Sequence, residues 1–161
     1  LDIHKPNQVW QIDITYIPMK NGFMYMTAVI DVYSRYIVGW GISNSLEASE
    51  SLKVVQEAIK IHGKPEILNS DQGTQFSCHS YVEYLKKEDI KISMDGKGRC
   101  LDNIFIERFW RTIKYQHIFL NPAIDGLDLY LGIQKWLQRY HNRGHQGIEL
   151  KKPAEKYILA A

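Results

Sequence analysis

The chain has 161 residues, of which 45% are hydrophobic and 24% are charged, and its formal net charge is +2. These values are typical of a globular domain, and the length suits one domain with a substantial core. The longest apolar run, residues 23–30, is too short for a membrane helix, and two cysteines cannot form a disulfide framework. Disordered, collagen-like, membrane-spanning and disulfide-scaffold classes are therefore excluded. Because residue 1 is Leu, we expect a piece of a longer polypeptide.

The charges are distributed unevenly along the chain. Residues 1–85 carry 6 Lys and Arg against 9 Asp and Glu, whereas residues 86–161 carry 14 against 9. A basic C-terminal half could lie along phosphates, and it could equally consist of solvated helix faces. Charge by itself leaves both interpretations open.

Three strands are predicted in the first 45 residues. Residues 10–16 are apolar at every second position, which is the period of a half-buried strand. Asn21-Gly22 predicts a hairpin turn, and residues 23–30 form the nearly continuous apolar run of a central strand. A turn at residues 31–35 then leads into a third strand over 36–42.

Helices alternate with short strands in the rest of the chain. The first predicted helix starts at an Asn44/Glu47 capping box and ends at Gly63 and Pro65. The later predicted elements are a strand over 67–69, a loop over 70–73, a helix over 81–87, a strand over 90–93, a mobile loop over 95–99, and helices over 102–116 and 127–141. This order predicts a single α/β domain with a mixed sheet.

Three carboxylates stand out by their placement. Asp13 lies on the polar side of a strand, Asp71 follows a strand end, and Glu107 borders the apolar stripe of a helix. Each also has an ordinary interpretation, namely a solvated strand edge, an Asx-turn, and a surface pair with Arg111. Together, however, they would supply the oxygen ligands that Mg²⁺ or Mn²⁺ prefers, and two such ions can promote phosphoryl transfer.

Around these residues the sequence closely resembles the integrase catalytic core of bacterial insertion-sequence transposases of the IS-three family, a DDE family related to retroviral integrases. The resemblance rests on the segments 10–16, 31–40, 70–76 and 102–114 and on the tail at 142–153. Between Asp71 and Glu107 lie 35 residues, the spacing typical of the family, and Lys114 stands where the family has Lys or Arg. The tail motif includes Arg143 and His145, whose role the sequence does not indicate.

The resemblance implies an α/β, ribonuclease-H-like fold with a five-stranded mixed sheet flanked by helices. It implies that residues 1–161 form a catalytic core, with an upstream DNA-binding region absent from the chain. Asp13, Asp71 and Glu107 would be the catalytic residues and would bind two Mg²⁺ or Mn²⁺ ions when DNA is present. The reaction would be strand cleavage at element ends followed by strand transfer, in transposition and DNA integration.

The resemblance also implies partners and a location. The partners would be DNA, as transposon ends and target, and further copies of the chain in a homodimer or larger homo-oligomer, in the bacterial cytoplasm and without a membrane. Lys114 and Arg111 are candidates for DNA contacts near the scissile phosphate. Lys97 and Arg99 are further candidates, although they could equally be solvated loop charges.

Two other interpretations compete with an active transposase core. A retroviral-type integrase core would share the fold and the three acids, but the strand and tail motifs resemble the bacterial proteins. A domesticated or inactive element core could serve as a DNA-binding or assembly module, and loss of a carboxylate would favour it. All three carboxylates are present in this chain.

Overall fold

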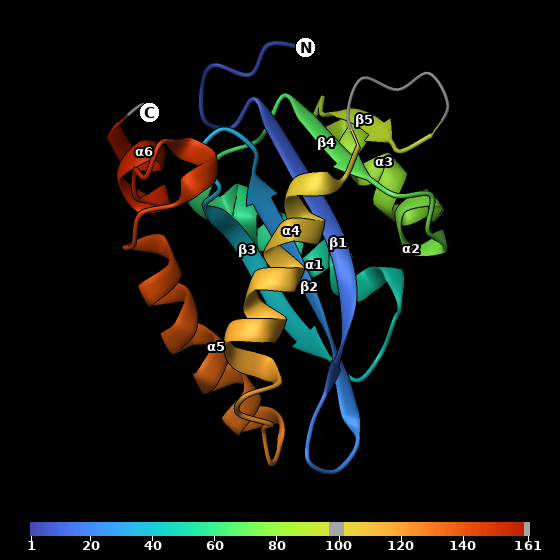
Figure 1. Cartoon of the computed structure of the whole chain (residues 1–161). Helices are drawn as coiled ribbons and strands as arrows, with labels where there is room; N and C mark the ends of the chain where they lie inside the picture. The colour runs from blue at the N-terminus through green and yellow to red at the C-terminus, as the bar shows by residue number, and fades with distance from the viewer. Residues whose placement is uncertain (97–101, 160–161) are drawn as a thin grey trace.

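The computed structural model describes residues 1–96 and 102–159, and its centre is a five-stranded sheet (Figure 1). The strands lie in the order β3-β2-β1-β4-β5. β1, β2 and β3 pair antiparallel, whereas β4 and β5 run parallel to β1. Their bounds are Val9–Pro18 for β1, Phe23–Asp31 for β2, Ile37–Ser43 for β3, Ile67–Ser70 for β4 and Lys91–Met94 for β5. The predicted five-stranded mixed sheet is confirmed.

Helices cover both faces of the sheet (Figure 1). They are α1 (Ala48–His62), α2 (Thr74–Ser77), α3 (His79–Lys87), α4 (Ile104–Ile113), a π-helical turn η1 (Lys114–Ile118), α5 (Gly126–His141), a 3-10 turn η2 (Gln146–Ile148) and α6 (Pro153–Leu159). α1, α2 and α3 pack on one face, and α4 and α5 pack on the other. Within the described residues, no helix is both long enough and apolar enough to cross a membrane.

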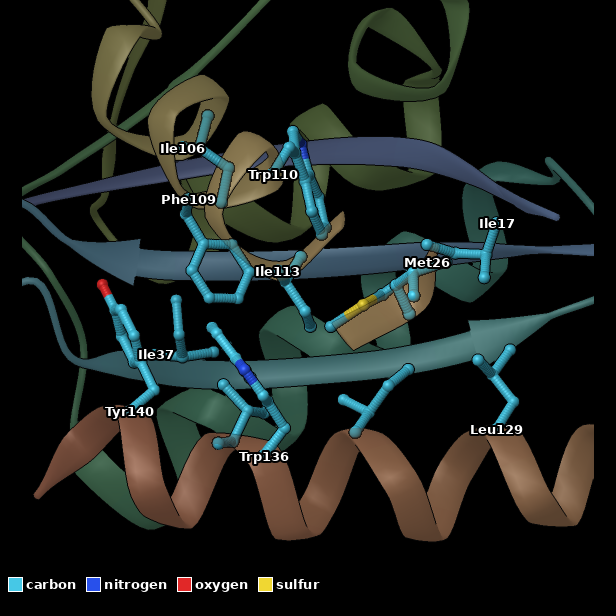
Figure 2. Close-up of a cluster of buried hydrophobic side chains, with 14 of the residues drawn as sticks. Ile17, Met26, Ile37, Ile106, Phe109, Trp110, Ile113, Leu129, Trp136 and Tyr140 are labelled. Atoms are coloured by element: carbon cyan, nitrogen blue, oxygen red, sulfur yellow. The ribbon is translucent and has the colours of Figure 1, made fainter. Parts of the chain in front are cut away.

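The core between the sheet and α4 follows from the periodicity of α4. Ile106, Phe109, Trp110 and Ile113 recur at three- and four-residue steps and are all buried, as the sequence predicts. Figure 2 shows these side chains between the strands and the inward-facing residues of α5, including Trp136. Burying one such side chain is worth about 1.5–3 kcal/mol. The stripe therefore fixes which side of α4 faces solvent.

Several predicted boundaries differ from the structure. The helix predicted over 102–116 is α-helical only from Ile104 to Ile113 and then widens into the π-helical turn η1. The Asn44/Glu47 capping box does not form, because Glu47 itself is the N-cap of α1 and makes no side-chain capping bond. α2 and α6 are additional helices, and α3 begins at His79 instead of residue 81. Most of the predicted loop over 95–99 lies outside the described residues.

Candidate active site

The side chains of β1 that face α4 form a row of polar contacts along that helix. Gln11 Oε1 accepts from two backbone N–H groups in the first turn of α4, at 3.1 and 3.2 Å. Asp13 Oδ2 accepts from the indole Nε1–H of Trp110 at 3.1 Å, and Thr15 Oγ1 accepts from Lys114 Nζ at 2.6 Å. These contacts come from alternate residues of the strand, which point to the same face. They fix Asp13 relative to α4.

The pairing of β1 with β4 places Asp71 close to Asp13. The two strands are parallel, and Gln11 pairs with Asn69 at the last ladder position. Continuing the same register for two residues brings Asp71 beside Asp13, just beyond the carboxyl end of β4. Ligands of α/β proteins commonly bind at such strand ends. The two acids, which lie 58 positions apart in the sequence, therefore meet through strand pairing.

The turn after β4 holds Asp71 in a defined local conformation. Asp71 is exposed, and its Oδ1 accepts from the backbone N–H of Gly73 at 2.7 Å, which is the Asx-turn that the sequence suggests. A Cβ atom at Gly73 would lie 2.8 Å from that same oxygen and 2.9 Å from Gln75 Oε1. A larger residue at this position would therefore have to displace the side-chain ends of Asp71 and Gln75.

Glu107 projects from the first turn of α4 and is exposed. Its charge is favourable at this end of a helix, where the backbone N–H groups carry partial positive charge. Among the ion pairs of the described residues, none joins Glu107 to Arg111. The surface pairing considered from the sequence is therefore not formed, and the Glu107 carboxylate is available to other partners.

The electrostatics of Asp13 show that the three carboxylates lie within reach of one another. The pKa of Asp13 is raised to about 6, mainly by burial and further by the negative charges of Asp71 and Glu107, while hydrogen bonds from the backbone of Ile14 and from Trp110 oppose the rise. Like charges held near a buried carboxylate favour its protonated form. The fold therefore places Asp71 and Glu107 near enough to Asp13 for their charges to disfavour its ionised form.

A hard divalent cation fits this donor set. Three carboxylates offer the oxygen ligands of an Mg²⁺ or Mn²⁺ site, and a cation would remove the repulsion that raises the pKa of Asp13. In residues 1–96 and 102–159, no three Asp, Glu, His or Cys side chains are already arranged to hold a metal ion. The side chains would have to adjust on binding, and ligation by Asp13, Asp71 and Glu107 stays a prediction.

A buried amide network, which sequence reasoning missed, anchors the start of α4. Asn69 Nδ2 donates to Asn103 Oδ1 at 2.9 Å and to Asp95 Oδ1 at 3.0 Å. Asn103 Nδ2 donates to the backbone oxygen of Ile12 at 3.0 Å, and the Nε2 of Gln11 donates to the backbone oxygen of residue 102 at 2.8 Å. The network ties α4 to β1 and β4, one turn before Glu107.

Asn103 is therefore not part of the exposed face of α4 that carries Glu107. It is only 2% exposed, and as the N-cap residue of α4 it is directed into the sheet. The available signal was weak: Gln11 and Asn69 are polar residues within predicted strands, and polar groups that become buried need partners.

The predicted DNA-contacting residues differ in their surroundings. Lys114 is half-buried and directed toward β1, and burial lowers its pKa while the nearby Asp13 carboxylate opposes that effect. Arg111 is exposed on α4, one turn after Glu107. Lys97 and Arg99 lie outside the described residues. DNA contact by these four residues stays a prediction.

The fold and the sequence both match known proteins. The HTLV-2 integrase catalytic core domain in complex with magnesium, in its dimeric form, superimposes with a TM-score of 0.74 at 20% identity, covering 95% of this chain and 97% of that one. The chain thus has the ribonuclease-H-like fold of integrase cores. Sequence profiles of the integrase core domain match residues 3–100 and 88–153. The chain belongs to the integrase core domain family.

Its relatives are insertion-sequence transposases of the kind that the motifs indicate. The transposase for insertion sequence element IS904 of Lactococcus lactis is 35% identical over 162 residues, covering 94% of this chain. The transposase InsF for insertion sequence IS3A of Escherichia coli K12 is 35% identical over 115 residues, covering 70% of this chain. The matched regions span 62% and 40% of these two proteins. The resemblance to the IS-three family is confirmed.

Proposed function

We propose that this chain is the catalytic core of a transposase that cleaves DNA strands at the ends of an insertion sequence and transfers them to a target. The observation that supports the proposal is that Asp71 and Glu107 both lie near enough to Asp13 for their charges to add to the effect of burial, which together bring the pKa of Asp13 to about 6. Membership of the integrase core domain family supports the same reaction. Loss of a carboxylate would favour an inactive module, and none is lost.

The three carboxylates would hold two Mg²⁺ or Mn²⁺ ions, which when bound supply charge neutralisation at the attacking and leaving oxygens of an in-line displacement. The residues of the chain keep those ligands in place. Trp110 orients Asp13 through its indole N–H, Gly73 leaves room for Asp71, and the buried amide network sets the position of the helix that carries Glu107. Such positioning is the main contribution of a protein to phosphoryl transfer.

The proposal extends to partners and context. The substrates would be the DNA of element ends and of the target, and Lys114 and Arg111 would contact it near the scissile phosphate. Binding of particular terminal sequences would reside in an upstream region of a longer polypeptide. We infer assembly as a homodimer or a larger homo-oligomer in the bacterial cytoplasm. The retroviral relatives are described in dimeric and trimeric forms.

Substitution of Glu107 tests the proposal. Glu107 is exposed, so Glu107→Gln should leave the fold intact while removing one cation ligand. We expect the variant of the complete transposase to lose strand cleavage and strand transfer on terminal-repeat duplexes by at least about a hundredfold, with either Mg²⁺ or Mn²⁺.

The matched control is Glu57→Gln, which neutralises an exposed glutamate on α1, on the other face of the sheet. It should retain full activity. If Glu107→Gln keeps activity comparable to that of the control, the catalytic assignment is wrong. If neither the parent protein nor the control processes any terminal repeat in the presence of these metals, the chain belongs to an inactive module and the proposed function fails.

A further inference from the structure

A second group of charged side chains lies on the other flank of α4. We define it as the basic cluster, which consists of Arg35, Arg108, Arg143, His145 and Lys156. These residues come from the turn between β2 and β3, from α4, from the segment after α5 and from α6. Arg35, Arg143 and His145 belong to the motifs that carry the family resemblance, yet none of them lies among the three carboxylates.

Aromatic rings support the guanidinium groups of the basic cluster. The guanidinium carbon of Arg35 lies 4.0 Å from the centre of the Phe105 ring, and that of Arg108 lies 5.9 Å from the same ring. The guanidinium of Arg143 lies 5.5 Å from the ring of Trp136. Contacts of this kind stabilise a cation and restrict its motion without neutralising it. The arginines are therefore held in place with their charge intact.

Two carboxylates lie near the basic cluster: Asp31, near Arg35 and Lys156, and Glu149, which is near Lys156 and pairs with Lys151 at 3.7 Å. None of the ion pairs in the described part of the chain includes Arg35, Arg108 or Arg143. The carboxylate of Asp31 lies near Arg35, but its Oδ2 already accepts from the hydroxyl and the backbone N–H of Ser34, at 2.5 and 2.9 Å. Arg143 donates to the neutral side-chain oxygen of Gln116 at 2.5 Å. The cluster thus has a surplus of positive charge.

The cations of the cluster affect one another. Burial lowers the pKa of Arg35, and the charge of Arg108 lowers it further. Burial likewise lowers the pKa of His145, with additional lowering by Arg35 and Arg143, so this imidazole is mostly neutral near pH 7 and the positive charge of the cluster resides on Arg35, Arg108, Arg143 and Lys156. Cations gathered at a cost in repulsion are stabilised by an anion that binds among them.

Three members of the basic cluster, Arg35, Arg108 and His145, line a small cavity beside α4. The cavity has a volume of about 50 Å³, and its lining includes Arg35, Arg108, Thr112 and His145. Its lining residues His145 and Gly147 come from the segment after α5, and Figure 1 shows that segment on the opposite side of α4 from β4 and β5. Consecutive residues of an α-helix project about 100° apart, so Glu107 and Arg108 lie on neighbouring flanks of one exposed ridge. A molecule lying across α4 would contact both.

We propose that the basic cluster binds backbone phosphates of the DNA duplex next to the strand being cleaved, a site that rests on the proposed transposase function. The planar guanidinium groups can each make two parallel hydrogen bonds to phosphate oxygens. Contacts of this type hold a duplex in register without reading its sequence. The tail motif with Arg143 and His145 thereby gains a role, which is to complete a phosphate site with Arg108 of α4.

DNA binding without metal tests the basic cluster separately from catalysis. The probe is a short fluorescent DNA duplex, titrated with the chain in EDTA at several salt concentrations and followed by anisotropy. The slope of log K against log salt is negative, and each lost phosphate contact should reduce its magnitude by about 0.9, equivalent to an affinity loss of about eightfold at 0.1 M salt. We expect Arg108→Ala to bind the duplex about eightfold more weakly than the parent does. In Arg108→Ala/Arg143→Ala the affinity should fall by about that factor twice.

The control variant removes two positive charges from another part of the surface. Lys60 of α1 and Lys87 of α3 are exposed on helices that pack against the other face of the sheet, and Lys60→Ala/Lys87→Ala should bind nearly as the parent does. Thermal unfolding checks the fold of each variant. If Arg108→Ala/Arg143→Ala unfolds, the exposed single substitution Arg108→Ala still decides.

Three outcomes would overturn the phosphate site: an unchanged salt slope in Arg108→Ala, equal losses in the arginine and lysine double variants, or equal arginine-dependent binding of a poly-glutamate peptide. The last would identify an acidic-protein surface instead. The proposed function is judged by a different experiment, which is the measurement of strand transfer by Glu107→Gln. Normal DNA binding by Arg108→Ala combined with inactivity of Glu107→Gln would refute the phosphate site and leave the transposase function standing.

Discussion

Replacement of Asp13 by Asn should stabilise the metal-free protein while it removes a proposed metal ligand. Asp13 is half-buried, and its carboxylate is destabilised by burial and by the charges of Asp71 and Glu107. Asparagine has nearly the same shape, and its side-chain oxygen can still accept from the indole of Trp110. The substitution therefore removes an unfavourable charge and keeps the packing.

The pKa of Asp13 sets the size of the effect. The difference between a pKa of about 6 and the ordinary value of 3.8 corresponds to about 3 kcal/mol at pH 8, where the carboxylate is ionised. Part of this gain is lost because the new amide group needs partners of its own. We expect the free energy of unfolding to rise by about 1–3 kcal/mol, or the melting temperature by roughly 2–12 °C.

The raised pKa of Asp13 also determines how the stability of the parent changes with pH. Between about pH 4 and pH 6, folded Asp13 holds a proton that the unfolded chain has released, so the parent loses stability as the pH rises through this window. The variant lacks that loss. Urea unfolding in EDTA should therefore give Asp13→Asn a higher free energy of unfolding than the parent at pH 8, and this difference should disappear near pH 4. Adding Mg²⁺ at pH 8 should stabilise the parent more than the variant.

Two results would refute this reasoning. One is a variant no more stable than the parent at pH 8 although its circular dichroism is unchanged. The other is a gain in the free energy of unfolding that is as large at pH 4 as at pH 8. Such a gain would come from packing and not from removal of the charge. Glu57→Gln removes an exposed carboxylate and should change stability by less than about 0.5 kcal/mol.

Two further substitutions test the scaffold of the site. Asn103→Ala would remove one of the two acceptors of the buried Asn69 amide and one donor to the backbone oxygen of Ile12. We expect the free energy of unfolding in urea to fall by about 1–3 kcal/mol, together with slower strand transfer. His141 is stacked on Tyr36 and half-buried, and this burial lowers its pKa to about 4. The free energy of unfolding should therefore fall by about 2–3 kcal/mol as the pH drops from 7 to 4.5. His141→Gln should flatten that dependence.

The controls for these substitutions are matched by residue type. Asn121→Ala, at an exposed position, should cost less than about 0.5 kcal/mol, and an equal cost for Asn103→Ala would contradict the buried network. His79→Gln, also exposed, should keep the acid sensitivity of the parent. If His141→Gln loses stability in acid as steeply as the parent does, His141 is not the group responsible.

The local pattern of the sequence sufficed to predict those elements whose periodicity fits only a strand or only a helix. The alternation in residues 10–16 predicts that Asp13 faces away from Ile12 and Ile14, and the three- and four-residue steps in α4 predict its buried stripe. The chemistry and spacing of the acids, together with the family motifs, singled out Asp13, Asp71 and Glu107. These features depend on residues close together in the chain, so a sequence displays them directly.

Long-range pairing decided the rest. Only the parallel register of β1 and β4 brings Asp71 beside Asp13, and only the docking of α4 turns Asn103 inward and Lys114 toward β1. The basic cluster likewise joins residues more than 100 positions apart, such as Arg35 and His145. A local pattern tells which face of an element is apolar. Which elements meet depends on how the whole chain buries those faces at once, and that is a property of the tertiary structure.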